Sequence, residues 1–200
     1  MRILFAAPDR DLLSGYRLLL EDCGHETATA FDGTGAVSKL ANGTFDLAIL
    51  DRDLPRVDAG RIVAMLNEQG VPVILLTKAR LHAAQLLEPA LANDYLTYPF
   101  LPAELTAAID ETARKAGSGE MFTAGDLTVD VPGFTLGGSV RLTGAEIDIL
   151  AALNRGETPQ TRHMSVYIAA LNNKFERLNR SQRIGFLPNE GYRMVMNREQ

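Results

Sequence analysis

The residues best placed to do chemistry follow directly on apolar runs in the first half of the chain. Asp51 and Thr77 each end such a run, and Asp9 and Asp53 are carboxylates close to these positions. The apolar runs alternate with amphipathic segments, a pattern typical of a parallel sheet with helices on both faces. In such a fold the reactive side chains are expected in the crevice at the carboxyl ends of the strands. Asp51 and Thr77 are therefore the first candidates for a reactive site.

The first 116 residues predict a doubly wound α/β domain, because strand and helix patterns alternate five times. The predicted strands cover residues 2–6, 25–29, 46–50, 71–76 and 95–97. The predicted helices cover residues 11–22, 35–41, 59–69, 81–92 and 102–115. Small flexible residues at 116–119 then mark a domain boundary.

The second half predicts a small α+β unit. Short strand patterns at 127–129, 134–136 and 140–142 precede Thr143, which forms a capping box with Glu146 at the start of a helix that runs to Leu153. A second helix is predicted at 162–178, where Met164, Ile168, Leu171, Phe175 and Leu178 make one apolar stripe. The chain then predicts a hairpin, with strands at 183–187 and 192–196 around a turn at 188–191.

Composition favours an intracellular protein with two compact units. The first residues lack the pattern of a signal peptide, and no apolar run is long enough to span a membrane, so we expect a cytoplasmic location. Cys23 is the only cysteine, which excludes an intrachain disulfide.

Charge is spread unevenly along the chain. The net charge is −5, yet residues 155–198 hold eight basic and three acidic side chains. Such a local basic excess is compatible with a polyanion partner such as DNA, and it is also compatible with an ordinary solvated surface.

Residues 1–116 resemble a CheY-like receiver domain. The resemblance is carried by the start Met1–Leu4, the run 45–51 ending in Asp51 before Leu54-Pro55, the run 72–77, and the segment 94–100. Together with the second half, the resemblance points to a response regulator of the OmpR/PhoB type, with a receiver at 1–116, a linker at 117–120 and a winged-helix-like effector domain at 121–200.

The receiver resemblance implies a phosphorylation site, and only part of that site is present. Asp51 matches the phosphoacceptor, while Thr77 and Tyr95 match the two residues of the receiver switch. The family's acidic pair is replaced by Ala7 and Pro8.

The positions that differ are those that would supply or hold the cations that assist phosphoryl transfer. Ala7 and Pro8 offer no side-chain oxygen to magnesium, and Tyr98, a neutral phenol, replaces the lysine. We therefore expect no cofactor and no functional magnesium site, with a rebuilt site of Asp9, Asp51 and Asp53 as the alternative left open. The receiver is expected to act as a fixed docking or dimerisation module, largely independent of phosphorylation.

Residues 120–196 resemble the winged-helix effector domain of the same family, with the helix at 162–174 matching the recognition helix. Only residues 156–161 separate it from the preceding helix, so one helix of the helix-turn-helix is expected to be missing. The resemblance implies promoter DNA as a partner. The candidate DNA-binding residues are Arg162, Ser165, Tyr167, Asn172, Asn173, Lys174, Arg177, Arg180, Arg183 and Arg193.

Two functions remain open at this point. The first is a DNA-binding transcriptional regulator that forms a homodimer through the receiver, where Leu86, Leu87 and Leu91 are apolar candidates for the contact. The second is an adaptor whose altered winged helix binds protein. An enzyme is not expected, because no dinucleotide fingerprint or phosphate-binding loop is present and the three histidines lie far apart. The sequence does not identify a sensor kinase.

Overall fold

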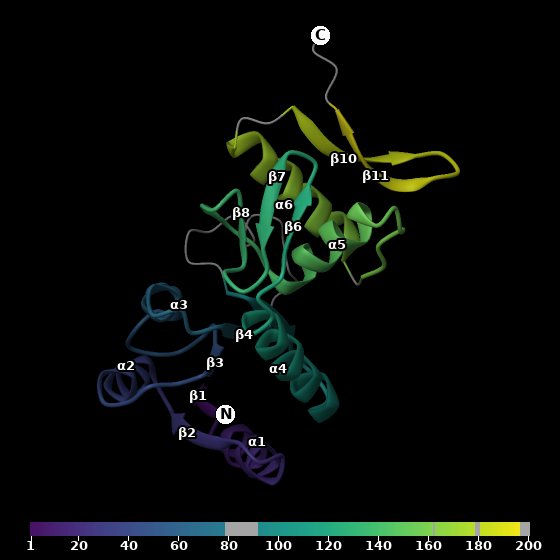
Figure 1. The fold of residues 1–200 in the computed structure, drawn as a ribbon. Coiled ribbons are helices and arrows are strands. Elements are labelled where there is room, and N and C mark those ends of the chain that lie inside the picture. Colours follow the sequence, from purple (N-terminus) through teal and green to yellow (C-terminus); the bar gives the residue numbers. More distant parts are fainter. Residues whose placement is uncertain (79–91, 162, 179–180, 197–200) are drawn as a thin grey trace. The chain divides into compact units, whose positions relative to one another are not determined.

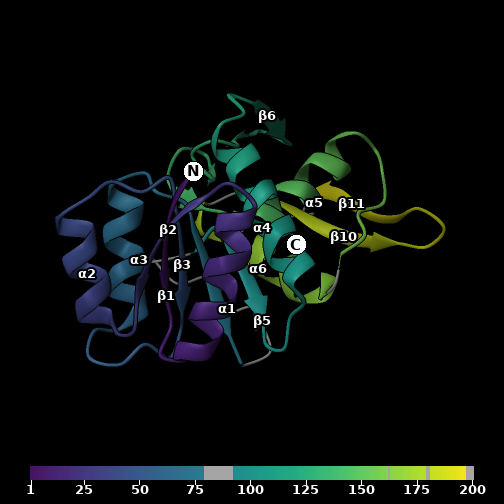
Figure 2. The same ribbon diagram turned by 90° about the horizontal axis from the view of Figure 1, so that it is seen from below.

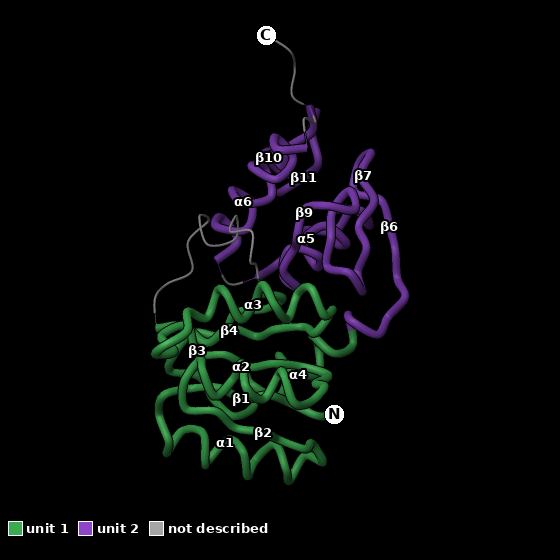
Figure 3. Tube along the Cα trace, turned by 90° about the vertical axis from the view of Figure 1, so that its left-hand side faces the viewer, with its two compact units in different colours: residues 1–80, 92–114 green, residues 81–91, 115–200 purple. Residues whose placement is uncertain are grey.

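The computed structural model describes residues 1–78, 92–161, 163–178 and 181–196. The chain divides into two compact units, and the division falls between Arg114 and Lys115 (Figure 3). In the described part of the chain, no helix has the length and apolar character needed to cross a membrane.

Unit 1 is built on a five-stranded parallel sheet, which confirms the predicted receiver fold (Figures 1 and 2). The strands follow the order β2-β1-β3-β4-β5, with bounds β1 (Arg2–Ala6), β2 (Glu26–Ala30), β3 (Leu47–Asp51), β4 (Val73–Thr77) and β5 (Asp94–Thr97). The central strands β3 and β4 are buried along their whole length, because helices cover both faces of the sheet.

Four described helices cover this sheet (Figure 2). They are α1 (Arg10–Asp22), α2 (Gly33–Ala41), α3 (Ala59–Glu68) and α4 (Pro102–Ala116). Leu13 and Leu20 of α1 and Leu105 and Ile109 of α4 join the apolar core on one face of the sheet, while α2 and α3 contact each other on the opposite face. The helix predicted at 81–92 falls almost entirely on residues 79–91, outside the described residues.

Aspartates cap three of these helices. The Asp9 side chain accepts hydrogen bonds from the first amides of α1, Asp32 does the same for α2, and Asp58 for α3. Each cap satisfies backbone amides that have no partner inside the helix. The loops at the carboxyl end of the sheet are thereby fixed where β1, β2 and β3 lead into their helices.

Unit 2 combines an antiparallel sheet with two helices and a hairpin (Figure 1). The sheet contains β6 (Met121–Ala124), β7 (Leu127–Asp130), β8 (Thr135–Leu136) and β9 (Val140–Arg141), and it is followed by α5 (Gly144–Asn154), α6 (Met164–Arg177), β10 (Gln182–Leu187) and β11 (Gly191–Met196). The predicted capping box at Thr143 and Glu146 is present.

Two features of unit 2 concern the sequence predictions. Strand β6 was not predicted, because it lies at the edge of the sheet and buries only Ala124 fully, so its sequence shows no clear alternation. Between α5 and α6 the described residues 155–161 and 163 contain no helix. In the described residues, α6 is therefore preceded by a loop and not by a further helix.

Candidate functional site

Asp51 lies at the carboxyl end of β3 and is only 4% exposed. One carboxylate oxygen, Oδ1, accepts a hydrogen bond from the backbone amide of Asp53 at 2.8 Å. The other, Oδ2, accepts a hydrogen bond from the hydroxyl of Tyr98 at 2.9 Å. Both oxygens of this buried carboxylate therefore have a donor, as the burial of a charge requires.

Tyr98 follows β5 and is held over Asp51 by both its backbone and its ring. Its amide donates to the carbonyl of Thr77 at 2.9 Å, and its ring lies 5.0 Å from the ring of Phe100. Burial first, and then the negative charge and hydrogen bond of Asp51, raise the pKa of Tyr98 well above the usual value for a phenol. The hydroxyl thus stays protonated and acts as a donor.

An aromatic row extends from this hydrogen bond across unit 1. Phe100 lies 5.3 Å from the ring of Tyr16, whose hydroxyl donates to the Phe100 carbonyl, and Tyr16 lies 6.3 Å from the ring of Phe5. Sequence analysis missed this row. The available signal in the sequence was the pair of aromatic residues Tyr98 and Phe100 on either side of Pro99, directly after the strand predicted at 95–97.

The two switch candidates lie on neighbouring strands. Thr77 ends β4, one residue beyond the position paired with Asp51, and is 2% exposed. Tyr95 lies on β5, three residues before Tyr98, and is half-buried. The sheet therefore brings Asp51, Thr77 and Tyr98 to one edge, as expected for the carboxyl ends of parallel strands.

The residues around Asp51 do not fit a magnesium site. Ala7 is fully buried and Pro8 is exposed, and neither offers a side-chain oxygen. Asp9 uses Oδ1 to accept the amides of Asp11 and Leu12 at 3.0 Å.

The third carboxylate of the alternative site, Asp53, faces a lysine. Its Oδ2 lies 3.5 Å from Nζ of Lys78. Among residues 1–78, 92–161, 163–178 and 181–196, no group of three or more His, Cys, Asp or Glu side chains is placed to hold a metal ion, so Asp9, Asp51 and Asp53 do not form such a group.

In unit 2 the predicted DNA-binding residues are only partly on the surface. Those that the structure exposes are Ser165, Asn173, Arg177 and Arg183. Two of the candidate DNA-binding residues are buried instead, since Tyr167 is 6% and Lys174 is 1% exposed. Arg162 and Arg180 lie outside the described residues.

Lys174 forms a buried ion pair instead of facing a nucleic acid. Its Nζ lies 2.6 and 2.7 Å from the two carboxylate oxygens of Glu146 on α5. Burial raises the pKa of Glu146 and lowers the pKa of Lys174, while their attraction opposes both changes. Thr143 also donates to Glu146 through its amide and hydroxyl, so the carboxylate is fully engaged within unit 2.

Asn172 also differs from the prediction. The Asn172 amide group bonds to the backbone of Ile184 in both directions, donating at 3.1 Å and accepting at 2.7 Å, so this half-buried side chain fixes β10 to α6 and does not point outward. Arg193 is half-buried and donates to the carbonyl of its neighbour Tyr192.

Comparisons with known proteins agree with the receiver geometry. The family model for the response regulator receiver domain matches residues 3–110. The chain is 35% identical over 169 residues to the transcriptional regulatory protein PrrA of Mycobacterium tuberculosis, an alignment that covers 78% of this chain and 72% of PrrA. The chain belongs to the response regulator family.

Other relatives extend this result. The DNA-binding response regulator MtrA of Mycolicibacterium paratuberculosis is 32% identical over 163 residues, which cover 77% of this chain and 72% of MtrA. A solved structure of a RitR mutant matches 98% of this chain and 99% of its own, with a TM-score of 0.66 and 22% identity, so it shares the fold. The chemotaxis response regulator CheY4 of Vibrio cholerae matches 56% of this chain, with a TM-score of 0.52 and 23% identity.

This response regulator should depend on Tyr98 for the stability of its receiver. Tyr98→Phe leaves one oxygen of buried Asp51 without a donor, and we expect the free energy of unfolding at pH 7 to fall by about 1–3 kcal/mol. Because folding raises the pKa of Tyr98, the contribution of its hydroxyl is fully present below pH 10, the ordinary phenol value, and declines as the pH rises above it. Urea unfolding at several pH values should therefore show the two proteins converging in alkali. Tyr192→Phe serves as the control, and equal stability of Tyr98→Phe and the parent at pH 7 would contradict the prediction.

The buried ion pair in unit 2 predicts a strong asymmetry between single and double variants. Lys174→Ala leaves Glu146 buried without its cation and should lower the free energy of unfolding by about 3–5 kcal/mol. The double variant Glu146→Leu with Lys174→Met removes both charges and should recover most of this loss, with a remaining cost of about 1–2 kcal/mol from the lost capping bonds of Thr143. Thermal and urea unfolding measure both, and a double variant as unstable as Lys174→Ala would be incompatible with this interpretation.

Proposed function

We propose that this response regulator is a transcriptional regulator of the OmpR/PhoB type that works in the cytoplasm largely without phosphorylation. The observation that carries the proposal is the hydrogen bond from the Tyr98 hydroxyl to Asp51. A phenol stands where the family resemblance implies a lysine, so the acceptor carboxylate has a neutral partner in place of a cation.

The chemistry of phosphoryl transfer explains why this matters. A carboxylate that attacks an anionic phosphoryl donor brings negative charges together, and cations must neutralise the charge that accumulates. Ala7 and Pro8 supply no ligand for a metal ion, and Tyr98 is uncharged. Lys78 is near, but its side chain is 67% exposed and faces Asp53. The barrier to phosphorylation of Asp51 is therefore expected to stay high.

Intact mass spectrometry tests the phosphorylation part of the proposal. Incubation with acetyl phosphate and magnesium should leave the mass of the chain unchanged, with a phosphorylatable receiver domain as the positive control. Stoichiometric addition of one phosphoryl group that disappears in Asp51→Ala would overturn the proposal.

The proposed output is promoter binding by unit 2, taken as a winged-helix-like domain. Support comes from the relatives, since MtrA is named as DNA-binding and PrrA as a transcriptional regulatory protein. Exposed Arg177 and Arg183, with half-buried Arg193, are the described side chains best placed for phosphates. Contacts to the phosphate backbone supply a large share of the energy of such binding, and exposed arginines can make them.

A second candidate, a protein-binding adaptor, is favoured by the surface of α5 and α6. Among the exposed positions of α6, only Arg177 in the last turn is basic, while Ser165, Ala169, Asn173 and Glu176 are not. Beside α5 lies a hollow of about 290 Å³, lined by Ala145, Ile149 and Ala152 and by the loop residues Thr158 and Pro159. This hollow borders the part of the chain where the resemblance implies a further helix.

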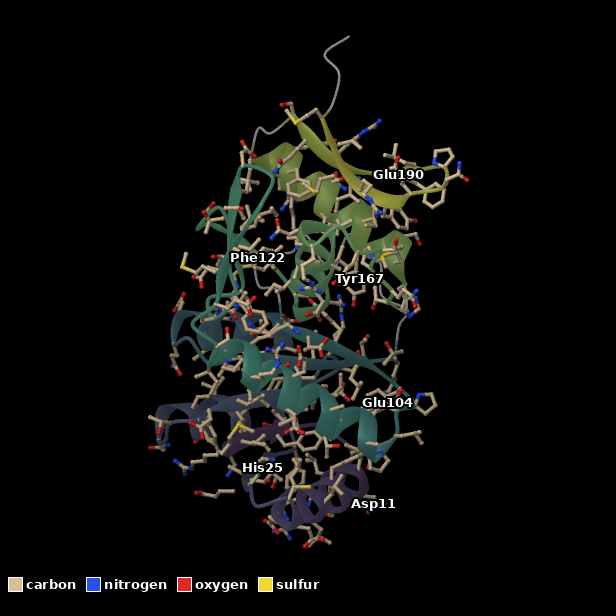
Figure 4. The ribbon with its side chains drawn as sticks, turned by 45° about the vertical axis from the view of Figure 1, so that its right-hand side comes forward. Asp11, His25, Glu104, Phe122, Tyr167 and Glu190 are labelled. Atoms are coloured by element: carbon tan, nitrogen blue, oxygen red, sulfur yellow. The ribbon has the colours of Figure 1, made fainter. Side chains whose placement is uncertain are left out.

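Dimerisation through the receiver belongs to the same proposal and rests on the family resemblance. The apolar candidates Leu86, Leu87 and Leu91 lie outside the described residues. Glu104, a charged candidate at the start of α4, accepts a hydrogen bond from the amide of Leu101 and so caps its own helix (Figure 4).

Salt dependence separates the two outputs. Binding to duplex DNA should weaken steeply as salt rises, and Arg183→Ala should reduce the slope of log affinity against log salt by about one. The double variant Glu146→Leu with Lys174→Met is the matched control, because Lys174 is buried and should not alter the slope. Absence of any DNA shift at low salt would favour the adaptor.

A further inference from the structure

Unit 1 contains a hollow whose lining does not include Asp51 or its neighbour Tyr98. It has a volume of about 450 Å³ and lies between α1 and the first residue of α4. Hollows of this size with apolar walls and few polar groups are typical of sites for small molecules. The lining is mainly apolar and consists of Asp11, Leu12, Gly15, Tyr16, Leu19 and Pro102.

One wall of the hollow is bare helix backbone at Gly15. A Cβ atom placed on this glycine would have open space around it, with no described atom beyond its own helix turn within 4 Å. Packing within unit 1 therefore does not require glycine here, although glycine inside a helix lowers its stability relative to alanine. The missing side chain leaves room for a ligand to approach the backbone of α1.

The aromatic wall of the hollow is Tyr16, which is held in place from behind. Its ring lies 5.3 Å from the ring of Phe100, and its hydroxyl donates to the Phe100 carbonyl at 3.3 Å. Phe100 in turn lies 5.0 Å from the ring of Tyr98, whose hydroxyl donates to Asp51. A molecule in the hollow would therefore contact the same aromatic row that holds Tyr98 over the acceptor.

Two carboxylates give the hollow a negative charge. Asp11 lines it directly, and the amides at this end of α1 are already bound by Asp9. Burial first, and then the negative charge of Glu104, raise the pKa of Tyr16 above its ordinary value, so Glu104 also acts on this site. Asp11 and Glu104 are exposed and lie on the same side of unit 1 (Figure 4).

The two arginines of α1 are directed to other partners. Arg10 stacks on the ring of Phe31, with its guanidinium carbon 4.2 Å from the ring centroid. Arg17 pairs with Glu21 one turn further along the helix, at 2.8 Å. The charge that a ligand meets in the hollow is therefore that of carboxylates, which attract a cation and repel an anion.

We propose that this hollow binds a small aromatic cation, whose ring packs against Tyr16 over the backbone of Gly15 while its ammonium group faces Asp11. Flat aromatic surfaces pack well on a tyrosine ring, and a cation near the ring face adds to the attraction. The site lies away from Asp51 and within unit 1, so the proposal does not depend on DNA binding. It gives the regulator an input that needs no phosphoryl transfer.

Two ligands that share one ring system and differ in charge provide the test. Tryptamine carries an ammonium group at pH 7, whereas indole-3-acetate carries a carboxylate on the same indole ring. When tryptamine is titrated into the full chain, backbone amide NMR signals of residues 12–19 should shift, with a dissociation constant of about 1 mM. Indole-3-acetate should bind about tenfold more weakly, because its charge is repelled.

Variants of α1 locate the binding. Gly15→Leu fills the hollow and should weaken tryptamine binding at least about tenfold, while the fold is kept because leucine favours a helix. Ser14→Leu, which places the same side chain at the adjacent exposed position outside the lining, should bind as the parent does. Asp11→Asn should weaken binding about threefold, and Asp22→Asn at the other end of the helix should not.

The results that would overturn the site are specific. Equal affinity for tryptamine and indole-3-acetate, undiminished binding of tryptamine to Gly15→Leu, or no shifts up to about 10 mM tryptamine would each do so. Thermal unfolding checks that every variant is folded. If Gly15→Leu were unfolded, Asp11→Asn and the comparison of the two ligands would decide, because neither alters the packing of α1.

Discussion

A buried carboxylate must find donors, and at Asp51 the donor that the fold supplies is the neutral hydroxyl of Tyr98. This one contact joins the ends of β3 and β5, since Asp51 is the last residue of β3 and Tyr98 directly follows β5. The Tyr98 amide is also bound to the carbonyl of Thr77 at the end of β4. The carboxyl edge of the sheet is thus tied together by hydrogen bonds of the chain itself, at the place where the family resemblance implies a metal ion and a lysine.

Unit 2 also buries a carboxylate, Glu146, and pairs it with Lys174. Glu146 is buried because the capping box holds it at the start of α5, and Lys174 enters the core of the unit to neutralise it. In both units a charged side chain that could contact a partner is bound within its own unit instead. On the exposed positions of α6 only Glu176 and Arg177 are charged, and on the hairpin arginine and aromatic side chains occupy opposite faces.

The sequence was sufficient to predict the parallel sheet, because its alternation of apolar runs and amphipathic helices is regular, and the strand bounds differ by only a few residues. It also placed Asp51 and Thr77 at the same edge, since the ends of parallel strands meet there. It could not predict the bond between Tyr98 and Asp51, which depends on a side-chain rotamer and on the loop after β5. The sequence showed that residue 98 carries no positive charge, but it did not show that the Tyr98 hydroxyl donates to Asp51.

The wrong predictions on α6 gave more weight to the resemblance to a DNA-binding helix than to the spacing of its apolar positions. Tyr167, Leu171, Lys174 and Leu178 are spaced four, three and four residues apart, which is the spacing of a buried stripe. Lys174 was assigned to DNA because it lies on the helix that resembles the recognition helix, but a lysine can be buried when a buried acid lies opposite it. Asn172 was misplaced because its amide pairs with the backbone of Ile184 on the next strand, a contact that the sequence pattern does not reveal.

The arrangement around Asp51 limits how such a regulator can be controlled. A ligand or modification shifts a two-state equilibrium only as far as it favours one state over the other. On the proposed function, the acceptor is engaged by Tyr98 and has no metal ligands at Ala7 and Pro8, so a phosphoryl donor would have little means of creating that difference. Control of the proposed DNA-binding output would then follow from the concentration of the chain or from a partner that contacts it, because both act by mass action and neither needs chemistry at Asp51.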